Sequence, residues 1–168
     1  DTREGQWPFA TVLSCIDSRT SAELIFDQGL GDIFSIRIAG NFANQDILGS
    51  MEFACNVAGS KLVVVLGHTK CGALKGGLDA PQIEGLGMDN LNHLIYHFES
   101  CIHEIIKEGE ERSSKNDDLL DRLTLCNIQK TIEDIRHQSS TLRNLEKEGK
   151  IKIVGANYDV ETGVVTWL

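Results

Sequence analysis

Short apolar runs alternate with amphipathic stretches along this chain. The apolar runs have the length and composition of strands and cover residues 10–13, 32–38, 62–66, 151–156 and 164–168. Stretches with helical spacing of apolar residues lie between them, at residues 21–28, 46–58, 72–77, 90–108, 119–136 and 140–148. Residues 79–88, with Pro81, Gly85 and Gly87, predict a loop, and the charged residues 109–118 predict a solvated turn.

This alternation is typical of an α/β fold with a mostly parallel central sheet of about five strands flanked by helices. The short connection through residues 161–163 indicates that the last strand runs antiparallel to the one before it. No internal repeat or low-complexity segment is visible in the sequence. We therefore expect one domain over residues 1–168.

Composition and charge narrow the classes of function. The chain of 168 residues is 41% hydrophobic and 24% charged, which is ordinary for a soluble domain with a sizeable core. A formal net charge of -9 argues against nucleic acid as a partner, because binding it needs clustered basic residues. No apolar run approaches the roughly 18 residues of a membrane span, so we expect no membrane partner.

The cysteines bear on the compartment. Three of the five, Cys55, Cys101 and Cys126, lie in helical patterns without the spacing of a disulfide framework. Free thiols favour a reducing compartment, and hence the cytoplasm. The chain begins at Asp1 rather than Met, so a leader removed upstream would instead allow the periplasm.

Two clusters with metal-ligand side chains directly follow predicted strands. Cys15, Asp17 and Arg19 follow the first run, and His68 and Cys71 follow the Val-rich run. In open α/β sheets the carboxyl ends of the strands are where ligands bind. Cys15, His68 and Cys71 are the three ligands that a catalytic zinc needs, with the fourth position left to water.

Asp17 is a second candidate for that fourth position. In an extended stretch its carboxylate points to the same side as Cys15, two residues earlier. Arg19 offers the same carboxylate a bidentate charged partner. The site can therefore be open, with Asp17 paired to Arg19, or closed, with Asp17 on the zinc.

These residues resemble the motifs of the β-class carbonic anhydrases. Residues 15–19 match that family's C-x-D-S-R, residues 37–41 its R-N-A-G-N, and residues 67–73 its G-H-x-x-C-G-A. Residues 158–163 are a weaker match to its closing Y-D-x-x-T-G. The order and spacing agree from about residue 6 to the end. Two positions depart from the family pattern, because Ile38 stands where Asn is common and Phe53 where many members have Tyr.

The resemblance implies reversible hydration of carbon dioxide to bicarbonate and a proton by zinc-bound hydroxide. It implies that Cys15, His68 and Cys71 hold Zn²⁺ and that Asp17 and Arg19 form the catalytic dyad, with Asp17 as a zinc ligand in the closed state. Substrate-binding positions carried over from the family are Gln6, Phe34, Ala39 and Gly72.

The family also implies an assembly, a homodimer or a higher homo-oligomer with pocket residues shared between subunits. Its N-terminal helices embrace the partner, and only 14 residues precede Cys15 here, so we expect that helical segment to be lacking. Two other functions stay open. Members of this fold also hydrolyse carbonyl sulfide or carbon disulfide, and a permanently closed site would bind zinc without catalysis.

Overall fold

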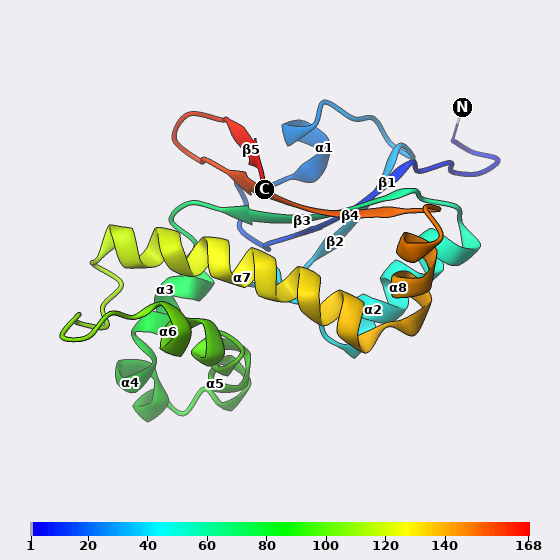
Figure 1. Ribbon diagram of the computed structural model, residues 1–168. Helices are drawn as coiled ribbons and strands as arrows, with labels where there is room; N and C mark the ends of the chain where they lie inside the picture. The colour runs from blue at the N-terminus through cyan, green and yellow to red at the C-terminus, as the bar shows by residue number, and fades with distance from the viewer. Residues whose placement is uncertain (1) are drawn as a thin grey trace.

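A five-stranded sheet forms the centre of the computed structural model, which describes residues 2–168 (Figure 1). Its order is β2-β1-β3-β4-β5, with all neighbours parallel except β4 and β5. The strands are β1 (Ala10–Ser14), β2 (Ile33–Arg37), β3 (Leu62–His68), β4 (Lys152–Tyr158) and β5 (Val165–Trp167). The predicted α/β class, the five strands and the antiparallel last pair are confirmed.

The central strands are apolar because both of their faces are covered. All five residues of β1 are buried, and β3 is buried from Val63 to His68. Buried parallel strands read as continuous apolar runs for this reason. The β4–β5 turn is closed by Asp159, whose carboxylate accepts a hydrogen bond from the Glu161 N–H at 2.8 Å.

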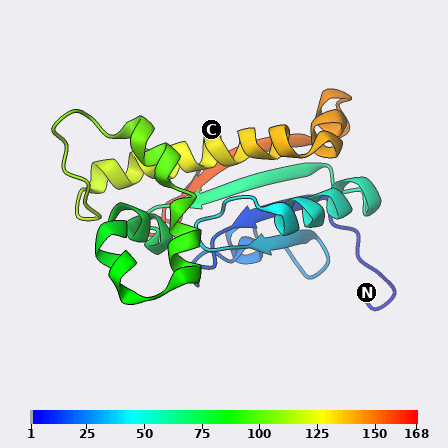
Figure 2. The same ribbon diagram turned by 90° about the horizontal axis from the view of Figure 1, so that it is seen from below.

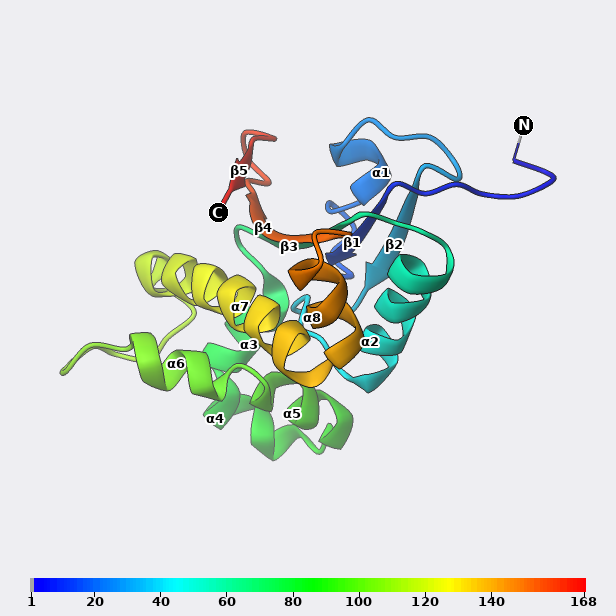
Figure 3. The same cartoon turned by 45° about the vertical axis from the view of Figure 1, so that its right-hand side comes forward.

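Most of the helices pack on one face of the sheet. Figures 1 and 2 show the long helix α7 running along that face, and Figure 1 shows the short helix α1 on the opposite face. Figure 3 shows α2 and α8 together at one end of α7 and α3 to α6 beneath the other. The helices are α1 (Ala22–Ile25), α2 (Gln45–Glu52), α3 (Gly72–Leu78), α4 (Ala80–Ile83), α5 (Asp89–Tyr96), α6 (Glu99–Ile105), α7 (Asp117–Gln138) and α8 (Ser140–Lys147).

Helix α7 approaches the sheet closely at β3. A Cβ atom on Gly67 would lie 2.5 Å from the Cδ1 atom of Ile128, so only glycine fits at that position without displacing Ile128. Asn116 caps the start of α7 by accepting a hydrogen bond from the Leu119 N–H. None of the helices in the described part of the chain is both long and apolar enough to cross a membrane.

The structure corrects two predicted segments. Residues 79–88 are not a loop throughout, because α4 and a 3₁₀ turn over Glu84–Leu86 occupy most of them. Residues 90–108 are not one helix but two, α5 and α6, which are separated at His97 and Phe98. The break turns the fully buried Phe98 ring against the backbone of Gly40 and Gly77.

The prediction of a solvated turn over residues 109–118 is wrong for its middle. Arg112 donates hydrogen bonds to the carbonyls of Leu78 and Gly77, at 3.1 and 2.6 Å, and forms a bidentate ion pair with Glu99. Its side chain is only 23% exposed. The segment is therefore fastened to the end of α3 and to α6.

Candidate metal centre

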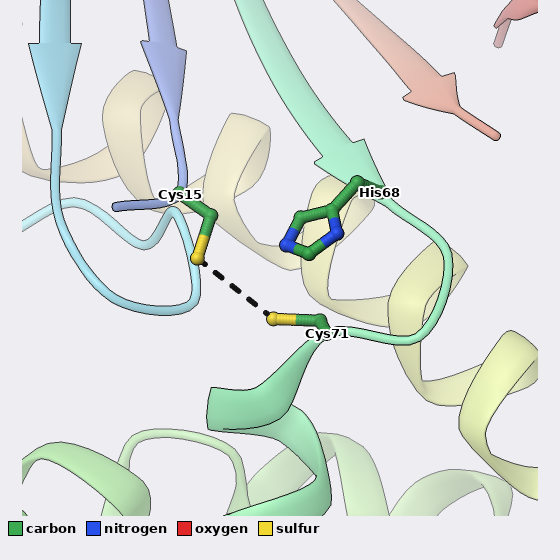
Figure 4. A group of neighbouring side chains, drawn as sticks. All are labelled: Cys15, His68 and Cys71. Atoms are coloured by element: carbon green, nitrogen blue, oxygen red, sulfur yellow. Dashed lines mark hydrogen bonds between the residues drawn. The ribbon is translucent and has the colours of Figure 1, made fainter. Parts of the chain in front are cut away.

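Three ligand side chains converge at the carboxyl edge of the sheet. Cys15 follows β1, His68 ends β3, and Cys71 immediately precedes α3. Strands β1 and β3 are adjacent and parallel, with Ser14 opposite Leu66, so both loops leave the sheet at the same edge. The ligand atoms lie within 4.8 Å of one another, and all three residues are buried (Figure 4). The two Sγ atoms are 4.0 Å apart.

His68 presents an unprotonated nitrogen to this cluster. Its Nδ1 lies 2.9 Å from the Thr69 carbonyl oxygen, which only accepts hydrogen bonds, so Nδ1 carries the proton. Its Nε2 is buried and has no hydrogen-bond partner in the described chain. A buried nitrogen without a partner is costly unless something binds it. Metal-ligating histidines have this arrangement, with one nitrogen held by the backbone and the other on the metal.

The two cysteines interact as a pair. The contact between the two sulfurs, with a smaller contribution from the Gly40 N–H, lowers the pKa of Cys15 despite its burial. The same pairing, together with burial, raises the pKa of Cys71. The N–H groups of Ala73 and Leu74, at the start of α3, favour its thiolate. Both sulfurs thus have donors that stabilise negative charge.

The donor set fits zinc. Two thiolates and a neutral imidazole neutralise a divalent ion, and zinc prefers sulfur and nitrogen ligands in tetrahedral geometry. The cluster supplies three of four ligands, which leaves one position open. Because the site lies at a loop edge rather than in a closed four-ligand cage, the geometry matches a catalytic zinc site.

Asp17 is paired with Arg19 instead of joining the cluster. Its Oδ1 accepts hydrogen bonds from Arg19 Nε at 2.9 Å and from the Arg19 backbone N–H at 3.0 Å, and its Oδ2 accepts one from Nη2 at 2.7 Å. These bonds hold the pKa of Asp17 well below its usual range. The carboxylate is therefore ionised and accepts hydrogen bonds only.

Arg37 supports the loop that carries Cys15 and Asp17. Its Nε donates to the Cys15 carbonyl at 2.9 Å, and its Nη2 donates to the Asp17 carbonyl at 2.6 Å. The Thr20 hydroxyl lies within hydrogen-bond distance of the same two carbonyl oxygens. Sequence reasoning assigned Arg37 no role in the site, although it begins the second family motif.

The four substrate-binding positions that the family resemblance implied do not lie together in the structure. Gly72 is exposed directly after Cys71, and Ala39 is half-buried in the loop after β2, beside Gly40. Gln6 lies next to Gly31, before the start of β2 and hence at the opposite edge of the sheet. Phe34 lies in β2 opposite Thr11, four residues before Cys15, and packs edge-to-face on Phe53. Within one chain, neither Gln6 nor Phe34 is brought to the cluster.

Comparison with known proteins agrees with this geometry. The family model described as "Carbonic anhydrase" matches residues 10–165. Carbonic anhydrase 2 of Mycobacterium tuberculosis is 33% identical over 159 residues, covering 95% of this chain and 73% of that protein. The carbonic anhydrase of Mycolicibacterium smegmatis is 33% identical over 162 residues, covering 96% of this chain and 75% of that protein.

Comparison with solved structures indicates which class of carbonic anhydrase the chain resembles. The β-carbonic anhydrase CcaA superposes with a TM-score of 0.87 at 25% identity, covering 99% of this chain and 75% of that chain. The β-carbonic anhydrase CafA of Aspergillus fumigatus superposes with a TM-score of 0.82 at 28% identity, covering 98% and 77%. The chain therefore belongs to the β-class of the carbonic anhydrase family.

Proposed function

We propose that the protein catalyses the reversible hydration of carbon dioxide to bicarbonate and a proton, with zinc held by Cys15, His68 and Cys71. The observation that carries the proposal is a buried cluster of three ligands with an open fourth position, together with an ionised carboxylate, Asp17, two residues after the ligand Cys15. Zinc in such a site lowers the pKa of a bound water to about 7 and makes it a nucleophile at neutral pH.

Asp17 orients the reacting water in this proposal. Because Arg19 keeps the carboxylate ionised, Asp17 accepts a hydrogen bond and donates none. Once this water has lost one proton, its single remaining hydrogen is held by Asp17, so a lone pair faces the carbon of the substrate. Fixing the geometry of a nucleophile removes entropy from the barrier before the reaction begins.

Arg19 also determines whether the fourth ligand position is free. While Nε and Nη2 of Arg19 hold the Asp17 carboxylate, that carboxylate is engaged and leaves the fourth ligand position to water. The Asp17–Arg19 pair supports the open arrangement in this proposal, and the closed arrangement requires that this pair break. We propose that Asp17 moves between the two partners and that activity rises on the alkaline side of neutrality.

We divide the proposed substrate-binding positions into those near the ligand cluster of their own chain and those away from it. Gly72 and Ala39 are near the ligands of their own chain, next to Cys71 and Gly40. Gln6 and Phe34 lie away from that cluster, so they contact substrate only if a second copy brings them to it. This placement supports a homo-oligomer with shared sites.

A groove along β2 is our candidate for the contact between copies. It has a volume of about 1340 Å³ and lies between β2 and α2, with Phe34, Arg37 and Phe53 in its wall. Strand β2 is at the edge of the sheet, and Phe53 is 53% exposed. An unpaired edge beside exposed aromatic rings is a surface that natural proteins usually cover.

Sedimentation tests this assembly. Phe53→Glu would place a charge in the groove and should shift the protein toward the monomer, while Leu24→Glu serves as the control. Leu24 is 83% exposed on α1, on the other face of the sheet. An equal shift in both variants, or none in either, would contradict the groove as the interface.

Metal analysis and stopped-flow hydration on the same preparation test the catalytic proposal. Asp17→Ala and Arg19→Ala should retain zinc but lose about 100-fold or more of the hydration rate. Arg3→Ala, in which a 93% exposed arginine is removed, is the matched control. Zinc-loaded Asp17→Ala that hydrates at the parent rate from about pH 7 to 9 would overturn the role of Asp17.

The same preparation distinguishes the other functions. Turnover of carbonyl sulfide or carbon disulfide well above that of carbon dioxide would assign the site to sulfur substrates. Zinc bound without turnover of any of the three would indicate a closed, non-catalytic site.

A further inference from the structure

Asn127 is a buried polar residue in the apolar face of α7. It is 4% exposed, and its neighbours along that face include Leu123 and Ile128, which are fully buried. A side-chain amide in such a position costs free energy unless it is hydrogen-bonded. Its Nδ2 donates to the Gly40 carbonyl at 2.8 Å, across 87 residues of sequence.

Gly40 belongs to a tight turn beside the metal ligands. The Asn41 N–H donates to the Ile38 carbonyl at 3.0 Å, which closes a β-turn over residues 38–41. Gly40 has φ +77°, the value expected for the third residue of a type II turn. The peptide between Gly40 and Asn41 is thus held at both ends, by Ile38 at its N–H and by Asn127 at its carbonyl.

The remaining polar group of Gly40 points at a metal ligand. Its N–H takes no part in closing the turn and lies 3.4 Å from Cys15 Sγ. We propose that Asn127 is a positioning residue of the metal centre, which holds the Gly40 turn so that its N–H donates to the Cys15 sulfur. This inference rests on the proposed zinc site and adds a support that comes from a different helix.

The hydrogen bond has a chemical consequence for the metal. An N–H aimed at a thiolate withdraws charge from the sulfur, so Cys15 donates less to the metal than a free thiolate would. A sulfur that donates less charge would leave more positive charge on the metal. The proposed reaction needs that charge, because it lowers the pKa of the bound water. Without Asn127, the Gly40 carbonyl loses its buried partner and the turn is free to shift away from Cys15.

Cobalt(II) substitution of Asn127→Leu tests the proposal with readouts other than activity. Leucine has a similar volume but no donor. We expect the thiolate-to-cobalt charge-transfer band to move to longer wavelength, because Cys15 without the N–H bond donates more charge. The dissociation constants for cobalt and zinc should still rise about 10-fold or more, because the Gly40 turn no longer holds the Cys15 sulfur in place. Thr131→Val is the matched control, because Thr131 is also buried, one turn further along α7, and makes no hydrogen bond to the Gly40 turn in the described chain.

The outcomes separate this inference from the zinc proposal. A cobalt-loaded variant with the parent's band and affinity would overturn the role of Asn127 and leave the zinc site standing. A parent protein that takes up no cobalt or zinc would overturn both. Should Asn127→Leu not fold, the parent substituted with ¹¹³Cd decides the matter. A scalar coupling between cadmium and the Gly40 amide proton would support the bond, and its absence would refute it.

Discussion

Gly40 and Phe98 should be strongly coupled in stability, because the Phe98 ring fills the space where any side chain at residue 40 would go. A Cβ atom on Gly40 would lie 2.3 Å from Phe98 Cζ. Gly40→Ala then combines two costs. Alanine at φ +77° costs about 1–2 kcal/mol, and overpacking against the ring costs about 1–3 kcal/mol more.

Phe98→Leu removes the clash without emptying the core. The ring atoms nearest Gly40 are Cζ, Cε1 and Cε2, and leucine has none of them. Alone, this change should cost about 1–2 kcal/mol, because it removes buried atoms and leaves a small cavity. In the double variant only the backbone strain and the leucine cost remain, so the two changes together should cost about 1–3 kcal/mol less than their sum.

Urea unfolding of the parent, the two single variants and the double variant, all at the same protein concentration, measures this coupling. Gly149→Ala is the control for strain alone, because Gly149 has φ +70° and nothing lies within 4 Å of the added Cβ. Additivity of Gly40→Ala and Phe98→Leu within about 0.5 kcal/mol would refute the packing argument.

Three further predictions concern pH and metal. Hydrogen bonds from Arg136 lower the pKa of Glu146, so this pair stabilises the fold fully above the unfolded pKa of about 4.3 and progressively less as the pH falls through the lowered folded pKa. In urea unfolding, Glu146→Gln should therefore destabilise the protein more at pH 7 than near about pH 3. Burial lowers the pKa of His97, which stacks on Phe42, and Phe42→Ala should raise it in an NMR titration. Chelation should lower the Tm of the parent but not of Cys15→Ser.

The strands and the convergence of the three candidate ligands could be predicted from sequence because both depend on local patterns. Residues 62–66 are continuously apolar since β3 is covered on both faces. Cys15, His68 and Cys71 follow such runs directly, and the parallel topology brings strand ends together. The start of α4 carried a signal that was missed, because Pro81 suits the first turn of a helix and does not only break one.

The remaining features depend on contacts between distant segments. The apolar periodicity of residues 90–108 continues through Phe98, and the break there results from packing on Gly40 and Gly77. Asn127 had no visible role because its partner is 87 residues away. Sequence spacing cannot show which backbone carbonyl a buried amide will meet.

The two arginines beside the candidate metal centre act on different parts of one loop. Arg37 binds the carbonyl oxygens of Cys15 and Asp17, so it fixes the backbone of the loop. Arg19 binds the carboxylate of Asp17, and its side chain is 49% exposed. The proposed exchange of Asp17 between Arg19 and the metal therefore needs a side-chain rotation and no refolding of the loop. Cys15 can keep its place while the Asp17 carboxylate moves, because Arg37 holds the backbone of both residues and Arg19 holds the carboxylate.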